Sequence, residues 1–315
     1  MGSFVARRLL AMVPLLLIIT FAVYALVLIV PGDPARTLAG GLHADPVEIA
    51  RIRHQLHLDQ PLLAQYWRWL THVVRGDLGQ SLFQHESVAH GIATRLPLTL
   101  SLALGGFVMS ILIGLPLGIL AGTRPGTVAD RSATVGASVG IAMPDFWLAI
   151  ILVVLFAVKV HLLPDIGYVK FSTSPLQWTK HLLMPWIALG LGGAATLARQ
   201  VRGSLIDTLD QDYVRTARAM GISERRVVWQ LALKNALTPA MTILGIQFAY
   251  LLGGTVIIEE IFSIPGMGKY ILGAIDAKDL PIVQGVVLLT AVVFVVVNLV
   301  VDIMYGVLNP KVRVS

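Results

Sequence analysis

The chain has 315 residues, of which 56% are hydrophobic and only 13% are charged, and its formal net charge is +6. Soluble globular proteins carry about 25% charged residues, so this composition predicts a protein whose main solvent is lipid. The basic residues are spread out, without a basic and aromatic platform, which argues against nucleic acid as the partner. The lack of cysteine excludes disulfides, a thiolate nucleophile and cysteine metal sites.

The N-terminal apolar run extends from Leu9 to Val30. The apolar core of a cleaved signal peptide is usually about 7–15 residues long and ends at a small-residue cleavage site. This run is longer and ends in Pro31-Gly32-Asp33-Pro34. We therefore expect a retained transmembrane helix, with a cleaved signal as the alternative.

The next stretch, Pro31 to Leu96, is polar enough to lie outside the membrane. Asp45 and Pro46 are typical of a helix start, and a second amphipathic helix is predicted after Pro61. We expect a small helical extracytoplasmic cap. Large aromatic residues are enriched at protein interfaces, and three of them in this cap are candidate contacts for a partner protein: Tyr66, Trp67 and Trp69.

Six segments reach the length of about 20 mostly apolar residues that a transmembrane helix requires. The fourth is the shortest. The segments are Leu9–Val30, Leu98–Leu120, Ala133–Val158, His181–Ala198, Ala236–Ile258 and Ile282–Tyr305.

Small residues recur one turn apart in two of these segments. They predict close approach of neighbouring helix backbones in lipid. Prolines in the second, third and fifth segments predict loosened or kinked helices. The glycine motifs are Gly114-x-x-x-Gly118, Gly118-x-x-x-Gly122 and Gly136-x-x-x-Gly140, and the prolines are Pro116, Pro144 and Pro239.

Asp145 lies well inside the third segment. A carboxylate at that depth costs roughly 2.5–3.5 kcal/mol on insertion scales, so it should face a wet cavity or a partner group. A role in the translocation path and a structural ion pair both remain open. Gln247, Tyr250 and Asn298 are further polar positions, which either bond between helices or line the same path.

The charged stretch from Asp212 to Asn235 predicts a helix–turn–helix elbow between the fourth and fifth segments. Gly221 suits a left-handed helix end, and Ser223 can cap the next helix, with Glu224 in its first turn. Ala217 and Gly221, four residues apart, would leave a bare patch that another protein could approach. A purely structural elbow would use similar residues.

Two stretches look like enzyme motifs but lack the spacing or the residues that those motifs require. In "HESVAH", from His85 to His90, the histidines stand five residues apart, whereas helical zinc coordination requires four. "SIPGMGKY" lacks the first glycine of a phosphate-binding loop and has tyrosine where that loop requires serine or threonine. His54 and His57 could share a metal, although a polar helix face explains them better. We expect no catalytic, cofactor-binding or metal-binding residues.

The distribution of Lys and Arg predicts the orientation. Thirteen lie in the tails and loops on one side of the predicted spans, and five lie in the short loops on the other. Because cytoplasmic loops carry the excess of basic residues, both termini and the elbow are expected in the cytoplasm.

The stretches "RTARAMG" and "LALKNALTP" resemble the cytoplasmic loop of ABC importer permeases. Ala217 and Gly221 match its second alanine and its glycine. Further blocks resemble the first permease subunit of dipeptide, oligopeptide and nickel importers: "PGDP", "LDQPLLAQYWRWL", "GDLGQSL", "LLGGTVIIEEIFSIPGMG" and "VDIMYGVLNPKVR". The loop departs from the family pattern at Arg215, Thr216 and Lys234. Asp145 departs too, so no pore chemistry is carried over to it.

The resemblance implies an all-α integral membrane protein with the six-helix fold of a type I importer permease. The expected parts are residues 1–93, with the first helix and the cap, a permease core at 94–306 with a coupling loop at about 199–235, and a tail at 307–315. The cargo would be a di- or oligopeptide, with nickel or glutathione as alternatives in the same family and a self-sufficient channel or secondary transporter as an alternative of another class.

The implied partners are a second homologous permease, two ATPase subunits that hold ATP and Mg²⁺, and an extracytoplasmic solute-binding protein. The elbow would contact the ATPase through Arg215, Thr216, Ala217, Gly221, Ser223 and Glu224. The aromatic residues of the cap would contact the binding protein.

Overall fold

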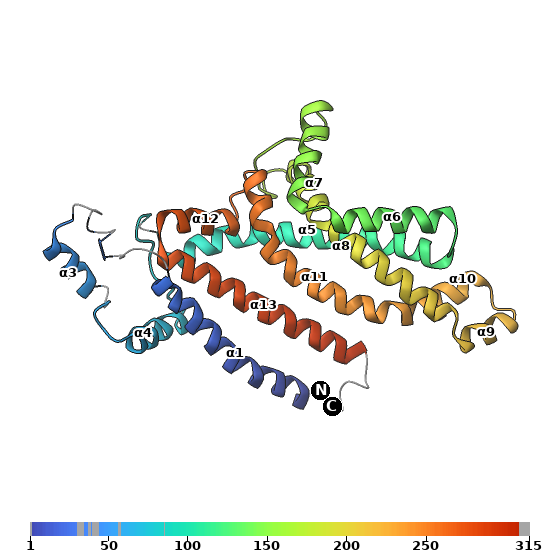
Figure 1. Cartoon of the computed structure of the whole chain (residues 1–315), viewed down its shortest axis with the longest axis horizontal. Helices are drawn as coiled ribbons and strands as arrows, with labels where there is room; N and C mark the ends of the chain where they lie inside the picture. The colour runs from blue at the N-terminus through green and yellow to red at the C-terminus, as the bar shows by residue number, and fades with distance from the viewer. Residues whose placement is uncertain are drawn as a thin grey trace. The chain divides into compact units, whose positions relative to one another are not determined.

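The computed structural model describes residues 2–29, 35–36, 39, 44–55, 58–84 and 86–308. Their secondary structure is helical apart from one isolated bridge between Gln80 and Ser87. The chain divides into two compact units (Figure 1): unit 1 comprises Met1–Pro97 and Lys269–Val295, and unit 2 comprises Leu98–Gly268 and Val296–Ser315. Residues 269–295 thus group with the N-terminal stretch rather than with the predicted core.

Long helices correspond to the predicted apolar segments. They are α1 (Gly2–Ile29), α5 (Val88–Thr123), α8 (Pro175–Leu209), α11 (Leu233–Ile261) and α13 (Leu280–Leu308). Among the described residues, three helices are long and apolar enough to cross a membrane, or up to five if each of two bent pairs is one span. In α1 the apolar helix that can be assessed is Met12–Ala25, which is shorter than a span. The count of six therefore stays a prediction.

The third predicted segment is not one straight helix. It consists of α6 (Val128–Ala142) and α7 (Asp145–Leu152), continued by the π-helix η2 (Val153–Lys159), and the two parts meet at 104°. Pro144 cannot donate a backbone hydrogen bond and disfavours helical geometry in the residue before it, so Met143 is extended at φ −82° and ψ 122°. Figure 1 shows α7 leaving the direction of α6 at this point. The fourth segment, expected to be the shortest, forms a helix of 35 residues.

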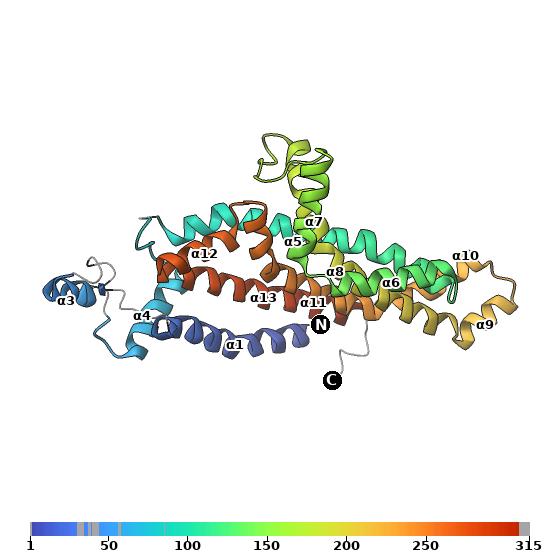
Figure 2. The ribbon, with the colours of Figure 1, turned by 45° about the horizontal axis from the view of Figure 1, so that its top comes forward.

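The core of unit 2 forms around α8, which packs against α6, α7 and α11. Its buried side chains include Leu102, Leu148, Leu182, Leu189 and Phe262. Figure 2 shows α8 beside α6 and α11 from a second direction.

The glycine motifs of α5 give the predicted close packing. A Cβ atom on Gly114 would lie 2.4 Å from the Ala194 carbonyl oxygen, and one on Gly118 would lie 2.8 Å from that of Ala198. Gly122 faces α8 in the same way. Because no side chain fits, the two backbones touch directly.

A buried carboxylate stabilises the turn after α11 through hydrogen bonds. Glu259 is fully buried, and its Oε1 accepts a hydrogen bond of 2.6 Å from the Thr99 hydroxyl. Its Oε2 accepts a bond of 2.7 Å from the Gly268 amide, and the Thr99 oxygen accepts one of 2.8 Å from the Met267 amide. A Cβ on Gly266 would lie 2.4 Å from the carboxylate. The turn therefore folds around Glu259, whose role the sequence reasoning missed.

Unit 1 contains the two short helices predicted for the cap, α3 (Pro46–Gln55) and α4 (Leu62–Val74). The carboxylate of Asp45 accepts a 2.9 Å bond from the Val47 amide, as expected of a helix cap. Farther along, the Ser81 hydroxyl donates a 2.5 Å bond to the buried Asp279, which follows α12 (Met267–Ala277). That the cap is extracytoplasmic remains a prediction.

Candidate functional site

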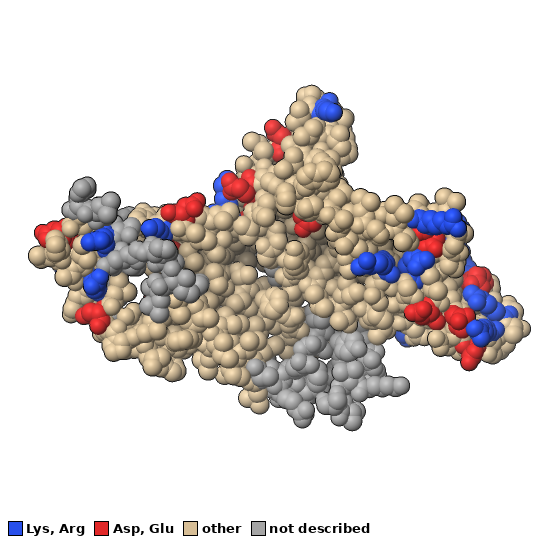
Figure 3. All heavy atoms as spheres, viewed as in Figure 1, with Lys and Arg blue, Asp and Glu red and all other residues tan. Residues whose placement is uncertain are grey.

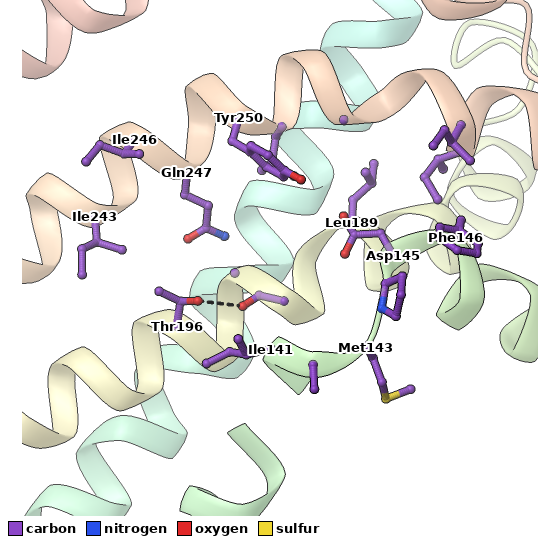
Figure 4. A pocket seen from close by; sticks show the side chains of 18 residues that line it. Ile141, Met143, Asp145, Phe146, Leu189, Thr196, Ile243, Ile246, Gln247 and Tyr250 are labelled. Carbon is purple, nitrogen blue, oxygen red and sulfur yellow. Dashed lines mark hydrogen bonds between the residues drawn. The ribbon is translucent and has the colours of Figure 1, made fainter. Parts of the chain in front are cut away.

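A cavity of about 800 Å³ lies in unit 2 where the break between α6 and α7 meets α8 and α11 (Figure 4). Most of its wall is apolar, with Leu189, Ile243 and Ile246 among the lining residues. Three of the four predicted path residues line it: Asp145, Gln247 and Tyr250. Asn298 is not part of this lining.

Asp145, which lies well inside the third predicted segment, is the first residue of α7. The amide groups of a first helical turn have no partners within the helix and carry partial positive charge, so this position favours a carboxylate. The Asp145 carboxylate makes no hydrogen bond or ion pair with the residues that the structure describes. Opposite it, a Cβ on Gly192 would lie 3.5 Å from its Oδ1, so α8 leaves room beside the acid.

Gln247 projects from α11 toward α8 (Figure 4). Its amide nitrogen and oxygen are buried without a hydrogen-bond partner in the described structure. A Cβ on Gly193 would lie 1.4 Å from the amide nitrogen, so the amide occupies the space over that glycine. An unsatisfied buried polar group costs about 1–3 kcal/mol, which a solute with its own donors and acceptors can recover.

Tyr250 and Thr196 complete the polar surface of the cavity. Tyr250 is 70% exposed, whereas the Thr196 hydroxyl is bonded to the Gly192 carbonyl at 3.1 Å (Figure 4). One carboxylate, one amide and one phenol in an apolar wall suit a polar solute with a cationic group. No group of three His, Cys, Asp or Glu that could hold a metal occurs in the described residues.

Of the histidines considered as metal ligands in the cap, His54 is described. The ring of His54 lies 3.9 Å from the Asp59 carboxylate, so it has an acidic neighbour of its own. His57 and His85 lie outside the described residues.

The predicted elbow consists of α9 (Asp212–Ala219), α10 (Glu224–Arg226) and the π-helix η3 (Val227–Ala232), which continues into α11. Gly221 has a φ of +78°, and the Ile222 amide bonds the Ala217 carbonyl at 3.2 Å. These are features of the left-handed helix end that the sequence predicts. Ser223 occupies the cap position but makes no capping bond through its side chain.

Ala217 does not form an open patch with Gly221. It is only 6% exposed and packs against Val214 and Val227 inside the elbow. Its small size therefore serves the internal packing of α9 on η3. The exposed apolar side chain at the turn is Met220, which is 74% exposed.

Ion pairs link exposed side chains on the outer surface of the elbow. Arg215 contacts Asp210 at 2.7 Å, and Arg218 contacts Glu224 at 2.6 Å. The hydrogen bond to Asp210 raises the pKa of the Arg215 guanidinium. Thr216 bonds the backbone of its own helix. Figure 3 shows acidic and basic side chains gathered together at the end of unit 2 that carries α9 and α10.

The aromatic residues of α4 divide into two groups. Tyr66 is buried against α1, where its hydroxyl lies 2.9 Å from that of Thr20, and Trp69 packs with its ring centroid 5.5 Å from that of Tyr24. Trp67 is 59% exposed. Helical periodicity thus turns Tyr66 and Trp69 toward α1 and leaves Trp67 as the exposed candidate for partner contact.

Comparison with known proteins assigns the family. The family described as "Binding-protein-dependent transport system inner membrane component" matches residues 114–314, and the N-terminal family of such membrane components matches residues 1–103. The chain belongs to this family and is a permease component of a binding-protein-dependent ABC importer. Permease components of ABC transporters are not themselves enzymes.

Full-length relatives carry two kinds of name. The chain is 40% identical, over 99% of both chains, to a Brucella abortus (strain 2308) protein proposed to be a peptide transport system permease. It is 40% identical, again over 99% of both, to the glutathione transport system permease protein GsiC of Salmonella paratyphi A. A solved structure of the MetNI methionine ABC transporter, in an inward-facing conformation, matches 69% of this chain and 96% of that chain with a TM-score of 0.55. At 20% identity this last likeness shows the fold alone.

Proposed function

We propose that the chain imports di- or oligopeptides and that the cavity at the α6–α7 break forms part of their path. The observation that carries the proposal is the pairing of an unpartnered carboxylate, Asp145, with the unpartnered amide of Gln247 in one apolar cavity. A peptide offers the matching groups, an ammonium and backbone amides. The volume of about 800 Å³ lies within the roughly 300–1,000 Å³ of small-molecule sites.

Glutathione is the second candidate cargo, because the relatives include proteins named for its transport. Its free amine and amide groups would use the same cavity. Nickel is less favoured, because the cavity supplies one carboxylate and no histidine. A self-sufficient channel or secondary transporter would need more ion-coupling side chains in the same region than the single carboxylate of the cavity wall.

The proposed role also implies partner subunits and an orientation in the membrane. A second, homologous permease would complete the path, and both termini would lie in the cytoplasm of a cell whose inner membrane holds the complex. Two ATPase subunits would hold ATP and Mg²⁺ and receive the elbow, with Met220 and Gly221 at its exposed turn. An extracytoplasmic solute-binding protein would meet the cap near Trp67. Asn298 stays a proposed path residue through its position in α13.

The cargo is tested by uptake in cells that express the complete transporter, compared with cells in which this chain is deleted. A panel of labelled di-, tri- and tetrapeptides, glutathione and Ni²⁺ should show loss of peptide uptake on deletion. Loss of Ni²⁺ uptake with normal peptide uptake would contradict the peptide assignment, and loss confined to glutathione would favour the second candidate.

A further inference from the structure

A buried ion pair joins the start of α6 to α8, near the end of α8 that leads into the elbow. Asp130 of α6 is only 3% exposed, and both oxygens of its carboxylate accept hydrogen bonds from the Arg202 guanidinium of α8. The bond from the terminal nitrogen to Oδ2 is 2.9 Å long. An arginine that bonds a carboxylate at two points fixes geometry as well as adding energy. The pair therefore sets how the two helices are placed along one another.

The same carboxylate holds the loop that precedes α6. Its Oδ2 accepts a 2.9 Å bond from the amide of Gly126, whose φ is +79°. The Asp130 amide in turn donates a 3.3 Å bond to the hydroxyl of Thr127, the residue that caps α6. Unlike the exposed ion pairs of the elbow, this pair is part of a buried hydrogen-bond network. Asp130 thus connects the loop, the first turn of α6 and α8.

Helix α8 connects the pair to both the elbow and the cavity. Leu209, seven residues after Arg202, packs against the interior of the elbow beside Val214. Gly192, ten residues before Arg202, lies beside the Asp145 carboxylate. The helix is continuous between these two points, over a length of about 25 Å at 1.5 Å per residue. A displacement of its elbow end can therefore reach the side of the cavity that α8 forms.

The other side of the cavity, at the α6–α7 break, moves with α8 only if α6 does. Near the break, α6 meets α8 through small apolar groups: a Cβ on Gly140 would lie 3.1 Å from the Ala195 Cβ. Packed helices can slide along such a contact by small shear movements. The two-point bond between Asp130 and Arg202 opposes sliding, because both oxygens would lose their donors.

We propose that Asp130 and Arg202 are positioning residues that make α6 and α8 move as one body, so that a displacement of the elbow reaches the cavity wall at Asp145. This inference rests on the proposed role of the elbow as the ATPase contact. Neither residue is among those that line the cavity, so neither would touch the cargo. The competing account is that the pair only stabilises the fold. The two accounts differ in what a complex without the pair does once it has assembled.

The first test measures movement and does not depend on the cargo. The chain has no cysteine, so cysteines introduced at the exposed Ser138 of α6 and Asp207 of α8 give this chain two defined spin-label sites. In the complete transporter, the distance distribution between the labels should be the same without nucleotide and with ATP and vanadate. With Asp130→Asn added, the distribution should broaden or shift with nucleotide. A shift in the parent protein, or no change in the variant, would overturn the proposal.

The second test measures peptide imported and ATP hydrolysed in the same proteoliposomes. Asp130→Asn and Arg202→Gln should keep ATP hydrolysis near the wild-type level and lower the peptide imported per ATP by roughly 2- to 30-fold, the range for coupling residues that touch neither ligand. The double variant should be no worse than the poorer single variant, because each change removes the same pair. A proportional fall of both activities, with a lower melting temperature, would reduce the pair to a structural role and overturn the proposal.

Matched controls remove one positive charge from exposed positions of the same helices: Arg131→Gln lies beside Asp130, and Arg199→Gln lies one turn before Arg202. Both should keep the wild-type label distances and the wild-type ratio of import to hydrolysis. Equal losses in the controls would attribute the effect to net charge and overturn the proposal.

If the neutral variants do not assemble, Arg202→Lys keeps the charge but cannot form both parallel bonds. It should give an intermediate ratio and a broadened label distance with nucleotide, and wild-type behaviour in both would overturn the proposal. Absence of peptide import in the wild type would mean that the cargo assignment has failed. The label distances would then still decide whether α6 and α8 move together.

Discussion

Asp145 shows how a carboxylate can be kept in an apolar part of a chain. The break at Pro144 places it at the start of α7, where free amide groups partly offset its charge, and Gly192 of α8 leaves space beside it. No described side chain satisfies it. We therefore propose that the partner of this acid comes from outside the chain.

Replacing Asp145 with Asn keeps the shape of the side chain and removes the charge. If the acid offsets the desolvation of a peptide ammonium group, Asp145→Asn should reduce uptake of peptides with a free N-terminus several-fold more than uptake of N-acetylated peptides. Uptake of both by cells expressing the variant is the measurement. Equal transport of both at wild-type rates would refute the path role, and loss of the assembled complex would favour a structural pair with the partner permease.

Glu259 is a second single residue with a distinct role, which is to stabilise the turn after α11. In Glu259→Gln one of the two acceptor oxygens becomes an NH2 donor, so either the Gly268 bond is lost or the bond with the Thr99 hydroxyl must reverse its direction, and neither bond keeps a charged acceptor. We expect a loss of about 1–3 kcal/mol of stability, seen as a lower melting temperature of the purified complex in detergent. The exposed neighbour supplies the control: Glu260→Gln should melt like the wild type. A normal melting temperature for Glu259→Gln would contradict the proposal that Glu259 stabilises the turn after α11.

The close packing of α5 on α8 depends on glycines, and a glycine of α6 that makes no such contact provides a comparison. Gly118 touches the backbone of α8, whereas a Cβ on Gly136 of α6 would meet no atom within 4 Å. Gly118→Ala should therefore separate α5 from α8 and lower the melting temperature, at a cost of about 1–3 kcal/mol. Gly136→Ala should be neutral or slightly stabilising, since alanine favours the helix by about 1 kcal/mol. Equal behaviour of the two variants would contradict the packing account.

The elbow is an element with a packed inside and an exposed turn. If the turn contacts the ATPase, Met220→Asp should abolish peptide-stimulated ATP hydrolysis in a complex that still inserts, because a charge would replace an exposed apolar contact. Arg215→Gln should have little effect, since exposed ion pairs contribute under about 1 kcal/mol. Normal stimulation in Met220→Asp would place the contact elsewhere on the chain.

At the scale of the whole molecule, hydropathy and helix-end chemistry predicted most of the fold. The apolar runs locate the long helices, Asp45 caps α3, and Gly221 adopts the predicted left-handed conformation. These features depend on local sequence. The 104° break was underestimated, because a proline indicates a kink but not its angle. The burial of Tyr66, Ala217 and Glu259 depends on which helices meet, and that information is not local.

The cavity was predicted only in part, for the same reason. Polar residues in apolar segments pointed to Asp145, Gln247 and Tyr250, which the fold brings to one wall. The glycines that make room for them, Gly192 and Gly193, gave no signal beyond their small size.

The central claim is that this chain forms the membrane path of a peptide importer driven by partner ATPases. It is tested most directly by uptake of a labelled peptide into proteoliposomes that contain the complete transporter, with and without enclosed ATP and with and without the solute-binding protein. The account predicts uptake only when both are present. Uptake without ATP, driven by an ion gradient across the same vesicles, would contradict it.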